Sequence, residues 1–362
     1  MTNNSLLQQR LQSQLITEHL FQKPEEIVAW FGAMQAQDYA ACKWGIGVRL
    51  PGATDASIEE AFAAKKIIRT WGQRGTLHIM APQDVRWMLQ LFTPRLYTAY
   101  AGHFRRLELD AGVLKKSNNA IARILEGKQL TRKELMFLLE KKGINTTGLR
   151  ANFLMVRAAW DGILCLGLKR AKEFTYTSLD DFAPVNKTLT REEAGAELAR
   201  RYFLSHSPAT LQDFTWWSGL NVVDAKKALE NSKHELTAEV FKGQTYWMPQ
   251  KQLTPQAISG TYMLPAFDEY LISYRDRSNA TSECREKNII FTNNGIFNPI
   301  IIEKGMVKGT WKRSFKKNGV SIEATTFKPL STSQKKYVIK AANEFGKFLG
   351  MSAPTLNTTQ LI

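Results

Sequence analysis

Ile67-Ile68-Arg69-Thr70-Trp71-Gly72-Gln73-Arg74-Gly75-Thr76-Leu77-His78-Ile79-Met80 is the stretch that decides the fold. It predicts two short strands joined by a turn, because two apolar segments flank a polar one that is bounded by glycines. Thr76 and His78 share one face of the second strand, and Leu77 and Ile79 share the other. Three predicted helices precede this hairpin, and three helices followed by a hairpin is the element order of a winged helix.

The three preceding helices are predicted from apolar spacing and capping residues. Residues 5–20 carry leucines at helical spacing. A second helix begins at Pro24, a favoured first helical position, and its apolar stripe continues to Met34. Ser57 is predicted to cap the third helix, because Glu60 completes a Ser-x-x-Glu capping box.

The same order of elements recurs twice further along the chain. Capping boxes at Thr131 and Thr190 mark the start of a helix in each round. The helix over 222–230 would be the recognition helix of the third round. The other elements of the two rounds are predicted helices at 115–126 and 149–160 and strands at 164–167 and 245–248.

From about residue 261 onward the sequence predicts short strands. Two turn signals are present, Asn-Asn-Gly and Lys316-Lys317-Asn318-Gly319, and each lies between two of the predicted strands. The predicted strands lie at 289–292, 297–302, 306–315 and 320–327, and a final helix lies at 333–349. We therefore expect an α+β protein with three tandem winged helices and a β-barrel-like C-terminal domain that carries a basic hairpin. The expected domains are residues 1–110, 111–188, 189–258 and 259–362.

The charge balance indicates a polyanionic partner. Forty-nine Lys and Arg against 33 Asp and Glu give the 362-residue chain a formal net charge of +16. Such a surface favours double-stranded DNA through counterion release, and a generally basic solvated surface is the alternative. The sequence shows no apolar run that could span a bilayer and no signal peptide. Three scattered cysteines fit a reducing compartment, so we expect a cytoplasmic, nucleoid-associated protein with no membrane partner.

Gln35-Ala36-Gln37-Asp38 is the candidate catalytic segment. An amide can accept from a water while it donates to a neighbouring oxygen, and so holds that water at a fixed angle. A pair of amides suits a reaction whose leaving group is already activated, because placing the water then matters more than deprotonating it. On a continuing helix Gln37 would point about 200° away from Gln35, so the two converge only where the helix ends or distorts. Solvated polar residues at a helix end are the alternative interpretation.

Five motifs in this order carry a resemblance to a known family. They are Gln35-Ala36-Gln37-Asp38, Arg69-Thr70-Trp71-Gly72-Gln73-Arg74-Gly75-Thr76-Leu77-His78, Asp213-Phe214-Thr215-Trp216-Trp217-Ser218-Gly219-Leu220, Leu264-Pro265-Ala266-Phe267-Asp268-Glu269-Tyr270 and Gly309-Thr310-Trp311. Over nearly its whole length the chain resembles the AlkZ/YcaQ-like family of winged-helix DNA glycosylases. The resemblance implies a monomer with tandem winged helices around a basic concave surface. It also implies hydrolysis of the N-glycosidic bond of alkylated or crosslinked purines.

The resemblance also implies roles for the candidate catalytic residues. The family's signature in its interstrand-crosslink branch is Gln, an apolar residue and Gln, which Gln35-Ala36-Gln37 matches. The two glutamines would hold a water beneath C1′ of a purine nucleotide alkylated at N7 or N3. Asp38 would stabilise the cationic sugar or accept a proton, and local backbone hydrogen bonding is its alternative role. The sequence singles out no Schiff-base lysine and no metal or phosphate-loop motif, so we expect a monofunctional enzyme without a cofactor.

Basic and polar residues near the predicted site are candidates for DNA contact or site lining. The DNA-binding candidates are Arg69, Arg74, Lys312, Arg313, Lys316 and Lys317, and solvated charge is the alternative for each. His78 and Asp268 are possible site-lining residues, and a histidine hydrogen-bonded at a sheet face is the alternative for His78. Asp268, Arg275 and Arg277 are expected to form an ion-pair network. We expect Trp216-Trp217 to be a packed turn rather than a stacking platform.

Two other function classes are compatible with the sequence. A non-catalytic winged-helix DNA-binding protein or transcriptional regulator would explain the helices and the charge equally well, but it has no need of the glutamine pair. A protein–protein scaffold is the third possibility, and it would show no salt-dependent binding to duplex DNA.

Overall fold

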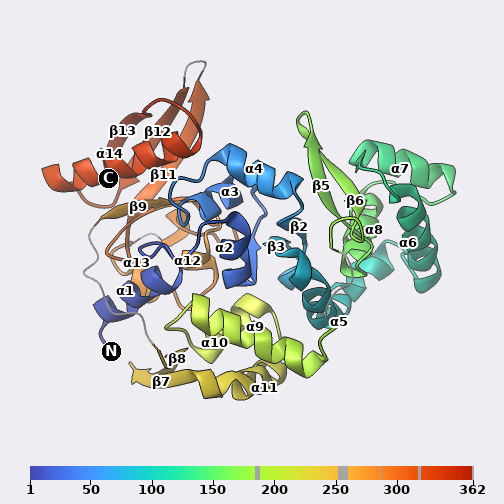
Figure 1. Cartoon of the computed structure of the whole chain (residues 1–362), viewed down its shortest axis with the longest axis horizontal. Helices are drawn as coiled ribbons and strands as arrows, with labels where there is room; N and C mark the ends of the chain where they lie inside the picture. The colour runs from blue at the N-terminus through green and yellow to red at the C-terminus, as the bar shows by residue number, and fades with distance from the viewer. Residues whose placement is uncertain (184–187, 252–259, 286, 317–318, 361–362) are drawn as a thin grey trace.

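The computed structural model describes residues 1–362 except 184–187, 252–259, 286, 317–318 and 361–362. Its strands form a six-stranded, a five-stranded and a two-stranded sheet, and helices pack around them (Figure 1). The mixed α+β class is therefore as predicted.

The N-terminal part contains the predicted hairpin and the helices that precede it. Its elements are α1 (Asn3–Ser13), α2 (Pro24–Phe31), β1 (Ala33–Gln35), α3 (Tyr39–Gly47), α4 (Asp55–Ala63), β2 (Ile68–Trp71), the 3-10 turn η1 (Gln73–Gly75) and β3 (Leu77–Met80). The predicted strand, turn and strand are confirmed, and Thr70 of β2 lies opposite His78 of the antiparallel β3. The first helix ends at Ser13, earlier than its predicted limit.

Two boundaries before the hairpin differ from the prediction. The second helix ends at Phe31, because Gly32 has a φ of 76° that a right-handed helix cannot contain. The chain then forms β1, an edge strand paired with β3, where a helix was predicted. The cap of α4 is Thr54, and Ser57 is its reciprocal partner in the capping box.

A second group of elements extends the same sheet. It contains α5 (Pro82–Arg106), α6 (Ala111–Leu125), β4 (Leu130–Thr131), α7 (Arg132–Lys141), α8 (Leu149–Trp160), β5 (Leu164–Arg170) and β6 (Glu173–Ser178). Arg69 of β2 pairs with Leu166 of β5, so six strands lie in the order β1-β3-β2-β5-β6-β4. The Thr131 capping box is confirmed at the start of α7.

A third group lies below this sheet in Figure 1. It contains α9 (Arg191–Ser205), α10 (Leu211–Ser218), α11 (Val222–Ser232), η2 (Lys233–Glu235), β7 (Leu236–Phe241) and β8 (Gln244–Pro249). The Thr190 capping box is confirmed, and β7 and β8 form the separate two-stranded sheet. The number of winged helices and the limits at residues 110, 188 and 258 remain predictions.

The C-terminal part is an open sheet rather than a barrel. Its elements are β9 (Thr261–Leu264), α12 (Glu269–Ile272), α13 (Ser278–Thr281), η3 (Lys287–Ile289), β10 (Ile300–Glu303), β11 (Met306–Lys316), β12 (Gly319–Thr326), α14 (Thr332–Phe348) and β13 (Thr355–Gln360). A barrel needs its first and last strands to pair. Within the described ranges the strand order is β13-β12-β11-β10-β9, and the edge strands β13 and β9 do not meet.

The predicted strand over 289–292 is also corrected. Phe291 meets Phe297 through one isolated bridge, and η3 occupies the start of the predicted strand. The guanidinium of Arg277 lies 5.2 Å from the Phe291 ring and 4.9 Å from the Phe297 ring. The segment therefore packs around a charged group instead of extending the sheet. The predicted pair of strands around residues 316–319 and the terminal helix are confirmed as β11, β12 and α14.

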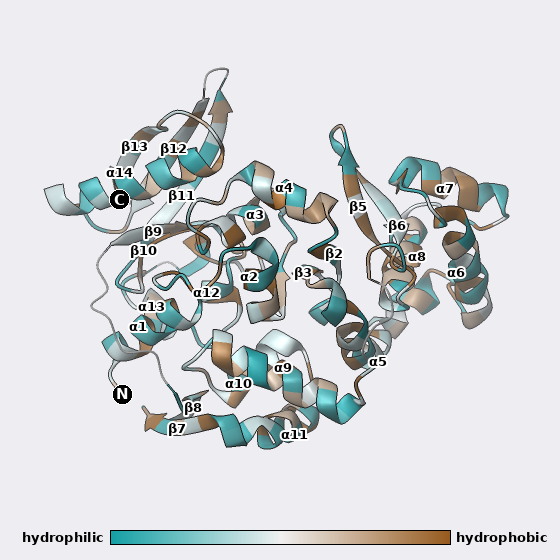
Figure 2. Cartoon of the chain, viewed as in Figure 1, coloured by the Kyte–Doolittle hydropathy of each residue, from teal (hydrophilic) through white to brown (hydrophobic). Residues whose placement is uncertain are grey.

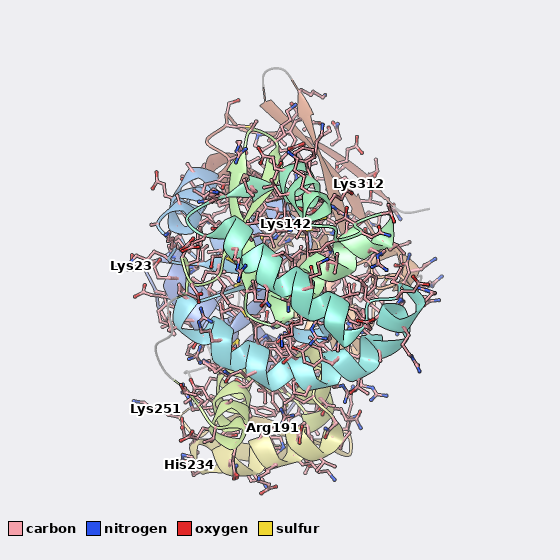
Figure 3. All side chains as sticks on the ribbon, turned by 90° about the vertical axis from the view of Figure 1, so that its right-hand side faces the viewer. Lys23, Lys142, Arg191, His234, Lys251 and Lys312 are labelled. Atoms are coloured by element: carbon pink, nitrogen blue, oxygen red, sulfur yellow. The ribbon has the colours of Figure 1, made fainter. Side chains whose placement is uncertain are left out.

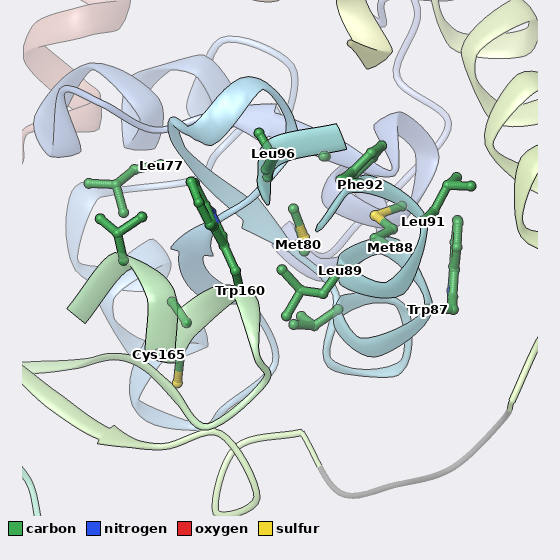
Figure 4. Close-up of a cluster of buried hydrophobic side chains, with 14 of the residues drawn as sticks. Leu77, Met80, Trp87, Met88, Leu89, Leu91, Phe92, Leu96, Trp160 and Cys165 are labelled. Carbon is green, nitrogen blue, oxygen red and sulfur yellow. The ribbon is translucent and has the colours of Figure 1, made fainter. Parts of the chain in front are cut away.

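Buried apolar side chains join the parts of the chain. The largest cluster connects β3, α5 and α8 with the third group, and Figure 4 shows Leu77, Met80, Trp87 and Trp160 within it. A second cluster joins α2 to α4 with the C-terminal sheet and α14, and it includes Trp44, which packs edge-on against Phe345. Helices such as α6 carry hydrophilic and hydrophobic residues along one ribbon, as one-sided burial requires (Figure 2). The N-terminal part of the chain therefore packs against other parts of the protein through both clusters.

Gly309 of β11 provides a test of the C-terminal sheet. A Cβ at Gly309 would lie 2.2 Å from the Thr325 carbonyl oxygen. We expect Gly309→Ala to push β12 away and to lower the free energy of unfolding in urea by about 2 kcal/mol. Gly102→Ala is the control: its Cβ meets nothing within 4 Å on α5, so it should raise stability by about 0.5–1 kcal/mol. Equal effects of the two substitutions would contradict this account.

Candidate active site

The segment from Gln35 to Gln37 runs extended beside β3. Ala36 N donates to Leu77 O at 2.8 Å, which continues the β1–β3 pairing beyond β1. Gln35 Nε2 donates to Thr76 Oγ1 at 3.2 Å, and Leu77 N donates to Gln37 Oε1 at 3.4 Å. Because the second helix ends before this segment, the two amides reach adjacent residues instead of pointing to opposite sides of a helix.

The two glutamines differ in what their amides can still bind. Gln35 is 8% exposed, and its Oε1 accepts from Ala36 N at 2.7 Å and from Gln37 N at 2.9 Å. An amide oxygen has two lone pairs, so these bonds use it fully. Gln37 is exposed, and its contact with Leu77 N is long. Gln37 therefore offers its amide to solvent, while Gln35 fixes the backbone that carries it.

Arg69 is buried and contacts the backbone of the glutamine segment instead of facing solvent. It is 5% exposed, and its Nε donates to Ala36 O at 3.0 Å and its Nη2 to Gln37 O at 3.4 Å. Its guanidinium also lies 5.2 Å from the Tyr39 ring and 4.6 Å from the Phe174 ring. Burial directs the charge of Arg69 to the backbone of the glutamine segment, and its contact with DNA stays a prediction.

Glu269 anchors the start of the segment and was not predicted from the sequence. Its Oε1 accepts from Gln35 N at 2.7 Å, and its Oε2 accepts from Trp217 Nε1 at 3.1 Å and from Ser273 Oγ. The carboxylate is buried, and His206 Nε2 lies 3.6 Å from Oε2. Glu269 thus joins β1 and α10 to the residues that follow α9 and α12.

The protonation state of Glu269 follows from these contacts. Burial works to raise the pKa of Glu269, but its contacts with His206, Ser273 and Gln35 N lower that pKa to about 2. Burial lowers the pKa of His206, against the opposing effect of its contact with Glu269. Glu269 and Trp217 both lie in motifs that carried the family resemblance. Membership of those motifs was the available signal, although it did not identify their partners.

Asp38 has a local structural contact. Its Oδ1 accepts from Ala41 N at 2.9 Å, so Asp38 is the N-cap of α3. Local backbone hydrogen bonding was the alternative interpretation of this residue. Asp38 is exposed at the same end of the segment as Gln37.

His78 lies inside the protein rather than lining an open site. It is fully buried opposite Gln35 in the β1–β3 ladder, and its Nδ1 lies 2.9 Å from Thr76 O. Burial, followed by the charge of Arg74, lowers its pKa from 6.5 to about 4. The site-lining prediction for His78 is therefore corrected, and the alternative of a hydrogen-bonded histidine at a sheet face describes it.

Asp268 pairs with a different arginine from those predicted. Arg49, which is fully buried, donates from Nη1 and Nη2 to the two oxygens of Asp268, both at 2.8 Å. Asp268 Oδ1 also accepts from Tyr270 N at 2.9 Å and so caps α12. The expected ion-pair network with Arg275 and Arg277 is therefore wrong, because the bidentate Arg49 satisfies the carboxylate.

The remaining basic candidates lie at two places. Arg74 occupies the η1 turn with a φ of 57°, and its Nη1 donates to Trp216 O at 3.4 Å. Lys312 and Lys316 are exposed on β11 (Figure 3 labels Lys312), and Arg313 lies over the Phe345 ring. Lys317 lies outside the described residues.

Metal sites and membrane spans are both absent from the part of the chain that the structure describes. They contain no group of three or more His, Cys, Asp or Glu that could hold a metal ion. None of their helices is both long enough and apolar enough to cross a membrane.

The buried His78 predicts a pH dependence of stability. The unfolded histidine binds a proton near pH 6.5 and the folded one only near pH 4. Its contribution to stability is therefore present above pH 6.5 and lost as the pH falls towards 4. We expect His78→Gln to remove up to about 3 kcal/mol of the pH dependence of unfolding free energy between pH 7 and pH 4. His234→Gln, at a 74% exposed side chain, is the control. Identical pH dependence in wild type and His78→Gln would refute this assignment.

Replacing Glu269 tests its anchoring role. Glu269→Gln puts an amide NH2 where the carboxylate now accepts from Trp217 or from Gln35 N, so one buried donor loses its acceptor. We expect the free energy of unfolding to fall by about 2–3 kcal/mol, measured in urea at pH 7. Glu173→Gln, at an exposed position on β6, should change it little. Wild-type stability of Glu269→Gln would show that the carboxylate does not hold these elements together.

Comparison with known proteins places this arrangement in a family. The model of the family described as "DNA glycosylase AlkZ-like" matches residues 28–348. The interstrand DNA cross-link repair glycosylase of Streptomyces sahachiroi is 23% identical over 317 residues, which cover 84% of this chain and 85% of the relative. The solved structure of Streptomyces sahachiroi DNA glycosylase AlkZ has the same fold, with a TM-score of 0.80 and 21% identity over 99% of this chain and 100% of that chain. The chain therefore belongs to the AlkZ-like DNA glycosylase family, whose members hydrolyse N-glycosyl bonds in DNA.

Proposed function

We propose that this enzyme excises alkylated purines from double-stranded DNA, by hydrolysing the N-glycosidic bond of nucleotides alkylated at N7 or N3. Bulky and interstrand-crosslinked adducts are included, because the Streptomyces sahachiroi relative is named for cross-link repair. The observation that carries the proposal is the exposed Gln37 amide on a segment that Gln35, Arg69 and Glu269 hold in place.

The chemistry suits a neutral amide. A purine alkylated at N7 or N3 carries a positive charge, so its bond to C1′ is already weakened and its departure leaves an oxocarbenium-like sugar. The enzyme then needs to place a water more than to deprotonate it. Gln37 is assigned to contact that water, and Gln35 positions Gln37 through the bond from Gln37 N to Gln35 Oε1. Asp38 adds a negative charge beside the cationic sugar while it caps α3.

The positive surface would bind the DNA backbone. Arg74, Lys312, Arg313, Lys316 and Lys317 are the proposed phosphate contacts, and each neutralised phosphate releases counterions. We expect a monomeric, monofunctional enzyme. Lys43, the lysine nearest in sequence to the glutamine segment, is bound to Asp55 and Glu59 at 2.7 and 2.6 Å.

The test is excision from duplex DNA that carries N7-alkylguanine, with abasic sites cleaved by alkali. Gln37→Ala should lower the single-turnover rate by about 100-fold while DNA affinity persists, because it removes the group that places the water. Gln35→Ala should lower both this rate and stability, because it frees the backbone of Gln37. Gln90→Ala, an exposed residue of α5, is the control.

Three outcomes of this assay would contradict parts of the proposal. Undiminished excision by Gln35→Ala and Gln37→Ala would remove the amides from the mechanism. Strand breakage without alkali, together with a borohydride-trapped adduct, would show lyase activity. Salt-dependent DNA binding without excision of any alkylated base would support the non-catalytic DNA-binding alternative.

A further inference from the structure

A cleft of about 350 Å³ lies between α5, α10 and the η1 turn. Trp216 lines it from α10, and none of the described residues that line it is Asp or Glu. Arg74 belongs to the turn itself, two residues before Thr76, which accepts from Gln35 Nε2. The turn therefore connects a residue of the cleft to a partner of the glutamine segment. Its charged lining residues are Arg74, Arg95 and Arg275.

The arginines of this region have acidic neighbours but form no direct ion pair among the described residues: Glu269 acts on Arg74 from a distance, and Asp213 and Asp276 act on Arg277. Across the residues that the structure describes, no carboxylate forms an ion pair with Arg74, Arg95, Arg275 or Arg277. The guanidiniums of Arg74 and Arg277 lie 6.0 and 5.2 Å from the centre of the Trp216 ring. An aromatic face orients a guanidinium without neutralising it, as a carboxylate would. Trp216 therefore orients the guanidiniums of Arg74 and Arg277 and leaves their positive charge in place.

The concentration of charge favours an anionic ligand. Burial, followed by the charge of Arg74, lowers the pKa of Arg277 to about 10, so Arg277 remains protonated at neutral pH. Several like charges around one cleft raise its electrostatic energy, and a bound anion lowers it. A guanidinium presents a planar fork of donors that matches two oxygens of one phosphate. The volume of the cleft is at the small end of the range for ligand sites.

We propose that this cleft binds a phosphodiester group of the DNA strand next to the nucleotide under attack, an inference that rests on the proposed function. Phosphate contacts fix the register of a protein on its strand. A short rigid path leads from the cleft to the water-placing amide. Trp216 adjoins Trp217, which donates to Glu269, and the other oxygen of Glu269 holds Gln35. The cleft thus sets the distance between one phosphate and Gln37.

Arg275 is the residue for the first experiment, because it is exposed and its side chain makes no ion pair that folding would lose. Arg275→Gln should reduce the slope of log affinity against log salt for a random duplex by about one. It should also raise KM for an alkylated duplex several-fold. Arg123→Gln, at an exposed position of α6, is the matched control. Equal salt slopes for the two variants would overturn the inference.

A second experiment locates the phosphate. Single phosphates around the lesion are replaced one at a time by neutral methylphosphonates. At one position, wild type should lose as much affinity as Arg275→Gln loses on normal DNA, and combining the two changes should add no further loss. Additive losses at every position scanned would show that Arg275 contacts no individual phosphate and would overturn the inference.

The two experiments separate this inference from the proposed function. The methylphosphonate and Arg275→Gln effects on binding could be non-additive while wild type excises no alkylated base. This result would support the phosphate site and contradict the glycosylase chemistry proposed for the glutamines. Excision that depends on Gln37, with additive methylphosphonate effects at all positions, would retain the chemistry and reject the phosphate site.

Discussion

The buried carboxylate of Glu269 is the interaction on which the candidate site depends. Its two oxygens accept from Gln35 N, Trp217 Nε1 and Ser273 Oγ, so one ionised group joins an N-terminal strand to the third group of helices and the C-terminal part. Burying a carboxylate is costly unless its lone pairs are satisfied. These donors satisfy it only when all three regions are folded together. The geometry of the glutamine segment is therefore a property of the whole chain and not of its first hundred residues.

Patterns among neighbouring residues predicted local structure well. They could not identify contacts between residues that lie far apart in the sequence. The capping boxes at Thr131 and Thr190 and the hairpin around Gly72 depend on residues within a few positions of each other. The end of the second helix at Gly32 was missed. A buried apolar residue beyond this glycine is compatible both with the apolar stripe of a longer helix and with an edge strand. The bond from Arg49 to Asp268 spans 219 positions, and that from Gln35 to Glu269 spans 234. No spacing rule reaches such distances, so motif membership identified Glu269 as notable without giving it a role.

The net charge of the chain combines two populations of arginine that sequence cannot distinguish. Arg49 and Arg69 are buried, and their guanidiniums satisfy backbone carbonyls or a carboxylate. Arginine suits this use because it offers five donors in a rigid fork and stays charged. Arg74 and Arg275 line a cleft without a carboxylate partner. The second population is the one more available to a polyanion, so the formal charge overstates the surface that DNA can bind.

The protonation states around the glutamine segment bear on which bases the proposed reaction can remove. An unmodified purine is a poor leaving group unless an acid protonates it. Glu269, with a pKa of about 2, is ionised at neutral pH, and His78, with a pKa of about 4, is neutral and buried. Neither group can supply that proton at neutral pH. A base that already carries an alkyl group and a positive charge needs no acid, and in the proposed mechanism Gln37 only places a water. Selectivity for cationic adducts would then arise because neither group can protonate an unmodified purine at neutral pH. A pocket shaped to one lesion would not be needed.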